Sequence, residues 1–262
     1  MKSKILLVVT TYNQSEYTKL CFDSLKKLDD NFDVLVVDDY SSDNTVELCK
    51  EYRYEVITKD EPMGLTDSWN KGYKRFRENV DYDYLIIANN DILIPKGALS
   101  ELVATYEKWP TFSLVVPMST QNGVGHNQVQ SIDNFYNNIP TCNTPENYQD
   151  TQEAILKLKK ESTKQNNLYI LDPLRIKMFN GFFFMMNSRI AHYEYSENIL
   201  FNPKYKITKN EDEFNWSKLI PNNDFPAVCK TSFVFHYKGV SAVGDLRDNQ
   251  KWEETRRMNE TN

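Results

Sequence analysis

Residues 5–13 read ILLVVTTYN and residues 34–45 read VLVVDDYSSDNT. Each stretch begins as a continuous apolar run, over residues 5–9 and 34–37, and then turns polar at once. Such runs are typical of strands that are buried on both faces of a parallel sheet. Apolar side chains recur at helical spacing between the two stretches: Tyr17, Leu20, Cys21, Leu25 and Leu28. The two stretches therefore predict a strand–helix–strand unit with parallel strands.

The same alternation continues to about residue 117. We expect strands over residues 54–57, 84–88 and 112–116, the last ending at Pro117, and helices from Ser42 or Asp43 to about Tyr52, from Thr66 onward and over residues 96–109. Strands that alternate with helices at this spacing predict an α/β fold with an open, mostly parallel central sheet flanked by helices. Ligands bind such sheets at the carboxyl ends of the strands.

The second part of the chain has a different texture. Residues 119–150 are rich in Asn, Gln, Thr and Pro, which predicts a long loop region of a kind that is more often functional than idle. We then expect a helix over residues 152–160, a strand over 182–186, a helix over 213–219 and a strand over 227–235. Because no repeat or linker is present, residues 1–245 are expected to form one domain, followed by a polar tail over residues 246–262.

Composition excludes several classes of protein. The 262 residues carry a formal charge of -6, so no global positive field draws in nucleic acid, and a nucleic-acid partner is unlikely on this balance. The four cysteines are widely spaced and form no C-x-x-C pair, which favours reduced thiols in the cytoplasm. No apolar run approaches the roughly 20 residues of a membrane span, which leaves room for peripheral association with a membrane. Oligomeric state is not encoded in any pattern that we recognise.

Polar side chains follow three of the expected strands. Thr10 to Asn13 follow the first, Asp38 and Asp39 the second, and Asn89 to Asp91 the fourth. Carboxylates at such an edge can hold Mg²⁺ or Mn²⁺ against phosphate groups. An Asx turn between strand and helix explains any one cluster equally well. Three clusters at one sheet edge favour a nucleotide site.

The phosphate-binding loops of two common nucleotide folds are absent. The sequence contains neither G-x-G-x-x-G nor G-x-x-x-x-G-K-[ST]. Enzymes that make sugar nucleotides usually carry a loop rich in Gly and Arg after the first strand, and residues 10–14 read TTYNQ. The pattern thus favours a protein that uses a sugar nucleotide over a nucleotidyltransferase that makes one.

Residues 9–13 together with 36–45 resemble the opening of family 2 glycosyltransferases. Five further segments follow in the family's order. They are the "G…N-x-G" helix at Gly64 and Asn70 to Gly72, the D-x-D region at Asn89 to Asp91, residues 180–184, residues 211–214 and residues 236–241. The last two resemble segments of rhamnosyltransferase-like members. The resemblance implies the GT-A fold, an inverting reaction, a nucleotide-sugar-binding half over residues 1–118 and an acceptor-binding, catalytic half over residues 119–245.

The resemblance also implies roles for single residues. Asp212 is the expected catalytic base, at the head of a helix that begins near Glu213. Asp91 is the expected metal ligand, with His236 as a second ligand or as a donor to the diphosphate. Asn89 replaces the first carboxylate of the D-x-D pattern, which leaves Asp91 as the sole carboxylate there. The implied cofactor is Mn²⁺ or Mg²⁺.

The donor is expected to be a nucleoside-diphosphate sugar of the UDP, dTDP or GDP type. Asp39 and Thr10 are expected at the base and ribose, with Tyr12 stacking and Asn13 in a turn. The remaining expected contacts to the nucleotide sugar are Asn70, Asn89, Asn90 and Gly181. The acceptor is a hydroxyl of a glycan, a lipid-linked saccharide or a similar molecule. The alternative is a catalytically silent GT-A domain that binds nucleotide sugar or scaffolds a partner.

Overall fold

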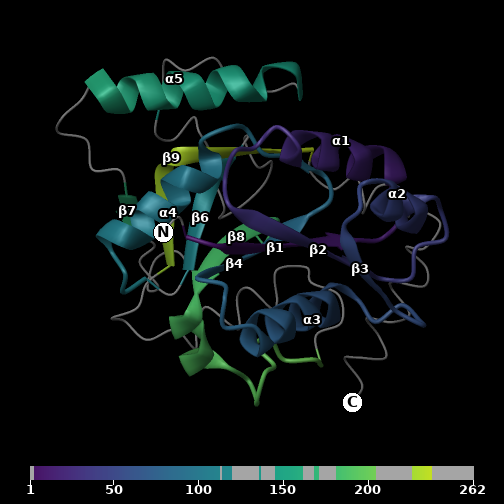
Figure 1. Ribbon diagram of the computed structural model, residues 1–262. Coiled ribbons are helices and arrows are strands. Elements are labelled where there is room, and N and C mark those ends of the chain that lie inside the picture. Colours follow the sequence, from purple (N-terminus) through teal and green to yellow (C-terminus); the bar gives the residue numbers. More distant parts are fainter. Residues whose placement is uncertain are drawn as a thin grey trace.

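The computed structural model describes residues 3–112, 114–119, 136, 145–161, 168–170, 181–204 and 226–237. Within these ranges, nine strands form a sheet in the order β3-β2-β1-β4-β8-β6-β9-β5, and β7 pairs with β9 (Figure 1). The expected helix over residues 213–219, the tail over residues 246–262, Asn180 and Asp212 lie outside the described residues.

The first half of the sheet is parallel, as the sequence predicts. Its strands are β1 (Ile5–Thr11), β2 (Phe32–Asp38), β3 (Glu55–Thr58) and β4 (Tyr84–Asn89), with β1 in the middle between β2 and β4. The connecting helices are α1 (Ser15–Leu25), α2 (Thr45–Glu51) and α3 (Leu65–Glu78). Each strand bound lies within three residues of the expected one, because an apolar run followed by polar side chains marks both ends of a buried strand.

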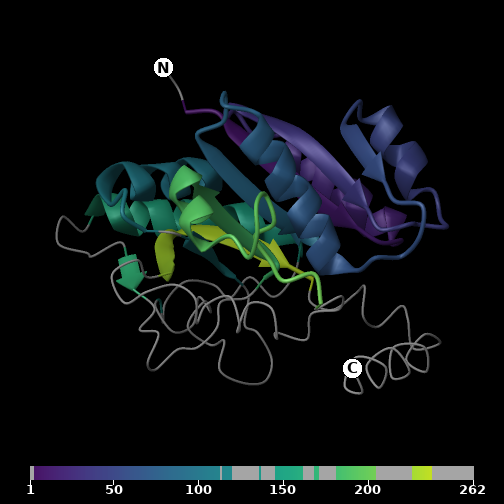
Figure 2. The same cartoon turned by 90° about the horizontal axis from the view of Figure 1, so that it is seen from below.

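The helices cover both faces of this half. In Figure 1, α1 and α2 lie on one face of the strands and α3 on the other, and Figure 2 shows α3 in front of them. Two apolar clusters result. Leu6 and Val8 of β1 pack with Trp69 of α3, whereas Leu7 and Val9 pack with helices α1, α2 and α4. Since successive strand residues point to opposite faces, burial on both faces requires the uninterrupted apolar run.

The second half of the sheet is mixed. β8 (Phe183–Asn187) runs antiparallel between β4 and β6 (Leu114–Ser119), while β9 (Pro226–His236) pairs in parallel with β6. The short strands β5 (Ile92–Leu93) and β7 (Leu168–Ile170) both run antiparallel to β9. The remaining elements are α4 (Ala98–Lys108), α5 (Tyr148–Glu161) and the short 3₁₀ helices η3 (Pro145–Asn147) and η4 (Ser188–Tyr193).

The prediction that the fifth strand ends at Pro117 is wrong. β6 continues through Pro117 to Ser119, and its pairing with β9 shifts at this point: Pro117 lies opposite Cys229, but Met118 lies opposite Phe233. Proline removes one ladder donor and is tolerated within a sheet at such irregularities. Helix α5 contacts the bulge through Gln152, whose side chain accepts from the Phe233 amide at 2.7 Å and donates to the Thr231 carbonyl at 2.8 Å.

Helix α3 is fastened closely to the sheet. A Cβ added to Gly72 would lie 2.6 Å from Val8 Cγ1, so only glycine lets the helix approach β1 this far. Two residues earlier, Asn70 accepts from the amides of Leu200 and Phe201 at 3.1 and 2.9 Å and donates to the Phe201 carbonyl at 2.8 Å. The N-x-G segment therefore joins α3 to β1 and to the chain around residue 200.

Cys21, Cys49 and Cys229 are free and buried. Burial raises the pKa of each thiol, that of Cys49 to about 12, so these side chains are poor nucleophiles at neutral pH. Cys142 lies outside the described residues. In the part of the chain that the structure describes, no helix has the length and apolar character to cross a bilayer.

Candidate functional site

The polar clusters predicted from the sequence meet at one edge of the sheet. Pairing of β1 with its neighbours places Thr11 opposite Asp38 and Thr10 opposite Asn89. The carboxyl end of β9 arrives at the same place, because His236 lies opposite Ile92 and the Tyr237 amide donates to the Asp91 carbonyl at 2.9 Å. Strands from both halves of the sheet thus deliver their terminal side chains together.

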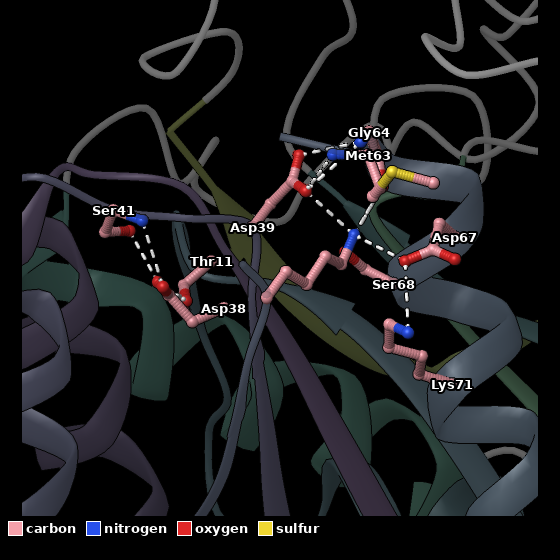
Figure 3. Close-up of polar contacts among 10 residues, drawn as sticks. Thr11, Asp38, Asp39, Ser41, Met63, Gly64, Asp67, Ser68 and Lys71 are labelled. Carbon is pink, nitrogen blue, oxygen red and sulfur yellow. Dashed lines mark hydrogen bonds and ion pairs between the residues drawn. The ribbon is translucent and has the colours of Figure 1, made fainter. Parts of the chain in front are cut away.

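Asp38 is a buried anchor for two loops. Its Oδ1 accepts from the Thr11 hydroxyl at 2.9 Å and from the Ser41 hydroxyl at 2.5 Å, and its Oδ2 accepts from the Ser41 amide at 2.9 Å (Figure 3). The carboxylate is fully buried, and hydrogen bonds to it offset the cost of desolvating its charge. Asp38 therefore fixes the loop after β1 to the loop after β2.

Asp39 points the other way, toward the segment between β3 and α3 (Figure 3). Its Oδ1 accepts from the Met63 amide at 2.8 Å and from the Gly64 amide at 3.1 Å, and its Oδ2 lies 2.9 Å from the same Gly64 amide. Lys59 Nζ lies 2.8 Å from Asp39 Oδ1. The expected base-binding carboxylate is thus held in a fixed orientation by its own chain.

Asn13 occupies the turn that the sequence predicts for it. Its φ is 54°, in the left-handed region that Asn tolerates better than most residues. The Asn13 amide donates to Ser41 Oγ at 2.7 Å, and its side-chain oxygen accepts from the Ser42 amide at 2.8 Å. Thr10 is buried beside it and donates from Oγ1 to the Ala88 carbonyl at 3.2 Å. Tyr12 lies partly exposed in the same loop.

Two of the predicted donor contacts have structural partners that the sequence did not reveal. Asn90 is 3% exposed, and its amide nitrogen donates to the Asn13 carbonyl and to Thr18 Oγ1 at 3.2 and 2.9 Å. Both amide hydrogens are used, so this side chain holds α1 to the end of β4 instead of offering donors to a ligand. Asn70 likewise faces the backbone at Leu200 and Phe201. Both side chains therefore hydrogen-bond to the protein itself, and their contacts to the nucleotide sugar stay predictions.

Asn89 and Asp91 differ from their neighbours. The buried Oδ1 atoms of both residues make no hydrogen bond within the described structure. Asp91 is 3% exposed. Its Oδ1 lies 3.2 Å from His236 Nε2, but the two atoms do not have hydrogen-bond geometry. The imidazole stacks on the Phe182 ring, with centroids 4.5 Å apart and planes at 12°. Gly181, buried, immediately precedes Phe182.

The Asp91–His236 pair fits a divalent cation. A carboxylate oxygen and an imidazole nitrogen are both ligands for Mn²⁺, and Mg²⁺ takes one or two carboxylates and fills its other positions with water and phosphate oxygens. Among the residues described here, no group of three or more His, Cys, Asp or Glu side chains comes together. A cation at this pair would therefore need oxygens from a bound diphosphate or from water.

The sequence model of glycosyl transferase family 2 matches residues 6–191. The chain belongs to glycosyl transferase family 2. The match covers the parallel half of the sheet and continues through β8, so it includes the loops that carry Asp38, Asp39 and Asp91.

One relative by sequence is TarS, a poly(ribitol-phosphate) beta-N-acetylglucosaminyltransferase of Staphylococcus aureus. It is 28% identical to this chain over 127 residues, which are 47% of this chain and 22% of TarS. This chain therefore spans only part of the length of the relative that it matches.

Solved structures of glycosyltransferases share the fold. The structure of GalNAc-T7 with UDP, GalNAc and Mn²⁺ matches at a TM-score of 0.63 and 15% identity, covering 90% of this chain and 44% of that one. The mannosyltransferase PcManGT of Pyrobaculum calidifontis, with GDP-Man and Mn²⁺, matches at a TM-score of 0.57 and 15% identity, covering 93% and 60%. These likenesses confirm the predicted GT-A fold.

Sequence reasoning missed two residues of this edge. The sequence pattern includes Asp38 but predicts no role for it, and it predicts nothing for Lys59. The signal for Lys59 is its place two residues after the expected strand at residues 54–57, which puts it at the same sheet edge as the acidic residues.

Proposed function

We propose that this chain is an inverting glycosyltransferase that moves a sugar from a nucleoside diphosphate to an acceptor hydroxyl with the help of a divalent cation. The observation that carries the proposal is the pair formed by Asp91 and His236, with Asp91 Oδ1 3.2 Å from His236 Nε2. The pair lies at the edge of a GT-A sheet, where Thr10 and Asn89 also lie. The acceptor is a glycan, a lipid-linked saccharide or a molecule with similar hydroxyl groups.

The donor occupies the sheet edge from Asp39 to Asp91 in this proposal. Asp39 accepts an N–H of the base, Thr10 lies at the ribose, and Tyr12 stacks on the base. Asn89 Oδ1, buried and without a hydrogen bond, accepts from a donor hydroxyl, and Gly181 leaves room below the sugar. Asp91 and His236 hold Mn²⁺ or Mg²⁺. When bound, the cation supplies Lewis-acid stabilisation of the charge on the leaving diphosphate.

Asp212 is the proposed base. Its carboxylate takes the proton of the acceptor hydroxyl while that oxygen attacks the anomeric carbon on the face opposite the diphosphate. The new carbon–oxygen bond forms as the bond to the diphosphate oxygen breaks, and the electron pair leaves with the nucleoside diphosphate. The sugar therefore arrives on the acceptor with inverted configuration.

Donor binding is tested by thermal unfolding with UDP, GDP, dTDP or CMP, each in Mn²⁺, Mg²⁺ or chelator. A ligand at 100 times its dissociation constant stabilises a protein by about 2.7 kcal/mol, which is readily measured as a rise in Tm. We expect one diphosphate to raise Tm in the presence of metal and to lose this effect in chelator. Equal Tm values under every condition would contradict the proposal.

The base is tested by turnover of the nucleotide sugar that binds. Asp212→Asn should lower kcat by roughly 100- to 10,000-fold, the usual contribution of a general base, and leave the Tm rise with the diphosphate unchanged. Glu213→Gln removes the same charge one residue away and serves as the matched control. Full activity of Asp212→Asn would exclude Asp212 as the base.

A second candidate is a catalytically silent GT-A domain that binds nucleotide sugar or scaffolds a partner. Asn89 favours it, because this position lacks the charge that the first residue of the D-x-D pattern usually carries. A metal-dependent Tm rise without turnover of any donor would support this second candidate.

A further inference from the structure

Lys59 is a buried cation directly behind the proposed base-binding carboxylate. It follows β3, and its side chain is 2% exposed. Three oxygens surround its ammonium: Asp39 Oδ1 at 2.8 Å, the Gly64 carbonyl at 2.9 Å and Asp67 Oδ2 at 3.0 Å. The Asp67 contact is an ion pair without hydrogen-bond geometry. The ammonium therefore donates two hydrogen bonds and makes one further ion pair, all to groups of the chain itself.

These contacts leave the two oxygens of Asp39 unequal. Oδ1 is surrounded by Lys59 and by the amides of Met63 and Gly64, at 2.8, 2.8 and 3.1 Å. Among the residues that the structure describes, Oδ2 receives only the Gly64 amide, at 2.9 Å. A carboxylate oxygen has about two lone-pair sites, so Oδ2 keeps one acceptor position that no described residue uses. The Asp39 side chain is 14% exposed.

Stability alone is a weak reason for this arrangement. Burying an ammonium between carboxylates costs desolvation free energy that the ion pairs often fail to recover, and apolar residues of similar volume are frequently as stabilising. A buried ion pair with fixed geometry does, however, restrict which conformations its members adopt. The asymmetry at Asp39 is the consequence here, because Lys59 engages Oδ1 and leaves Oδ2 with a single contact among the described residues.

We propose that Lys59 is a positioning residue for recognition of the donor base. By holding Oδ1 of Asp39, it presents Oδ2 as an ionised acceptor for one N–H of the base. The inference rests on the proposed function, since it assumes that a nucleoside diphosphate binds at this edge. Lys59 touches neither base nor sugar and acts only through Asp39.

The test measures nucleotide affinity by calorimetry with Lys59→Met, Asp39→Asn and the double variant. The probes are whichever of UDP, dTDP or GDP binds the unmodified protein best and its analogue methylated at the ring nitrogen that carries the hydrogen. A hydrogen bond to a charged group corresponds to a factor of about 10 to 100. We expect Lys59→Met to raise the dissociation constant of the parent nucleotide about tenfold, and the double variant to match Asp39→Asn within about twofold, because Lys59 acts through Asp39.

The methylated analogue separates positioning from a general structural effect. It cannot donate to Asp39, so the unmodified protein and Lys59→Met should bind it equally. Equal losses for both probes would overturn the inference, since a disturbed loop weakens binding whatever the base donates. Lys59→Arg, which restores a cation with several donors, should recover most of the affinity.

Lys71→Met controls for charge. Lys71 Nζ lies 3.6 Å from the same Asp67 oxygen and is 39% exposed, and this control removes one positive charge without touching Asp39. We expect its affinity to stay within about twofold of the unmodified protein, and a loss equal to that of Lys59→Met would overturn the inference.

If no diphosphate binds the unmodified protein, the proposed function fails. If Asp39→Asn weakens binding and Lys59→Met does not, only the role of Lys59 fails.

Discussion

The carboxylates after β2 and the polar side chains after β4 lie at one sheet edge, yet the chain treats them differently. Asp38 and Asp39 receive hydrogen bonds on both of their oxygens, from Thr11, Ser41, Lys59 and two backbone amides. Asn89 and Asp91 each retain a buried Oδ1 with no hydrogen bond among the described residues. The protein completes Asp38 and orients Asp39, whose Oδ2 accepts from the Gly64 amide alone among the described residues. The second pair retains two acceptors that no described residue satisfies.

An unsatisfied buried acceptor costs about 1–3 kcal/mol, and native chains carry few of them. Two such oxygens within three residues indicate a place where a ligand completes the site. Hydrogen bonds to Asp38 and Asp39 hold the loop after β2 without a ligand. This lowers the entropic cost of ordering the loop when a ligand binds. The difference separates geometry that folding fixes from geometry that, in the proposed function, the cation and the diphosphate complete.

The largest expected effect comes from Asp91→Asn. This change removes the sole carboxylate of the proposed cation pair and should lower kcat/KM for the donor by roughly 100-fold or more. Because Asp91 Oδ1 makes no hydrogen bond, the free energy of unfolding without ligand should change by less than about 1 kcal/mol. Urea unfolding and steady-state turnover measure the two effects on one preparation.

Asp29→Asn is the matched control for Asp91. Asp29 is 86% exposed and pairs with Lys96 at 3.2 Å on the surface, so turnover should stay unchanged. A large loss of stability in Asp91→Asn would show that the protein, and not a ligand, completes this side chain, and the contrast with Asp38 would disappear.

Asp38→Asn should have the opposite signature. The amide offers one acceptor oxygen where the carboxylate accepts from Thr11 and twice from Ser41, so a buried donor is left unsatisfied. We expect the free energy of unfolding to fall by about 2–4 kcal/mol, measured by urea unfolding in the absence of nucleotide. A loss below about 0.5 kcal/mol would show that these hydrogen bonds do not hold the loops together.

The sequence predicts the parallel half of the sheet well because each strand is an apolar run that ends in polar residues. It also predicts that Asp39 and Asp91 share an edge, since strand ends in such a fold converge, whereas His236 is linked to Asp91 only through the family resemblance. It does not reveal which polar side chains face the protein. Asn70 and Asn90 bind partners 131 and 72 residues away, and such pairings depend on tertiary packing that no local pattern encodes. Pro117 ends a strand by propensity, but the bulge in β9 accommodates it.

Asn89→Asp sharpens the contrast with a smaller effect. It adds a second carboxylate two residues before Asp91 and restores the D-x-D pattern. Opposite charges attract more strongly at a partly buried site. We therefore expect Mn²⁺ to bind about three- to tenfold more tightly, which is a gain in binding free energy of up to about 1.4 kcal/mol. Electron paramagnetic resonance of free Mn²⁺ measures this without any donor. Unchanged Mn²⁺ affinity would place Asn89 away from the cation.

Tyr40→Gly should have the smallest effect and should raise stability. Tyr40 follows Asp39 with a φ of 68°, a left-handed conformation that costs residues other than glycine about 1–2 kcal/mol. Glycine removes this strain but loses about 0.5–1 kcal/mol through its freer unfolded chain. The net expectation is a gain of about 0.5 kcal/mol in the free energy of unfolding.

Tyr195→Gly is the matched control, because its side chain is 54% exposed against 51% for Tyr40, and its φ is not positive. Here glycine relieves no strain, and we expect a loss of about 0.5–1 kcal/mol. If both variants lost stability equally, Tyr40 would carry no strain. A gain at Tyr40 alone would mean that the hydrogen bonds of Asp38 and Asp39 hold this loop against the preference of its own backbone, as expected of a site that is built before its ligand arrives.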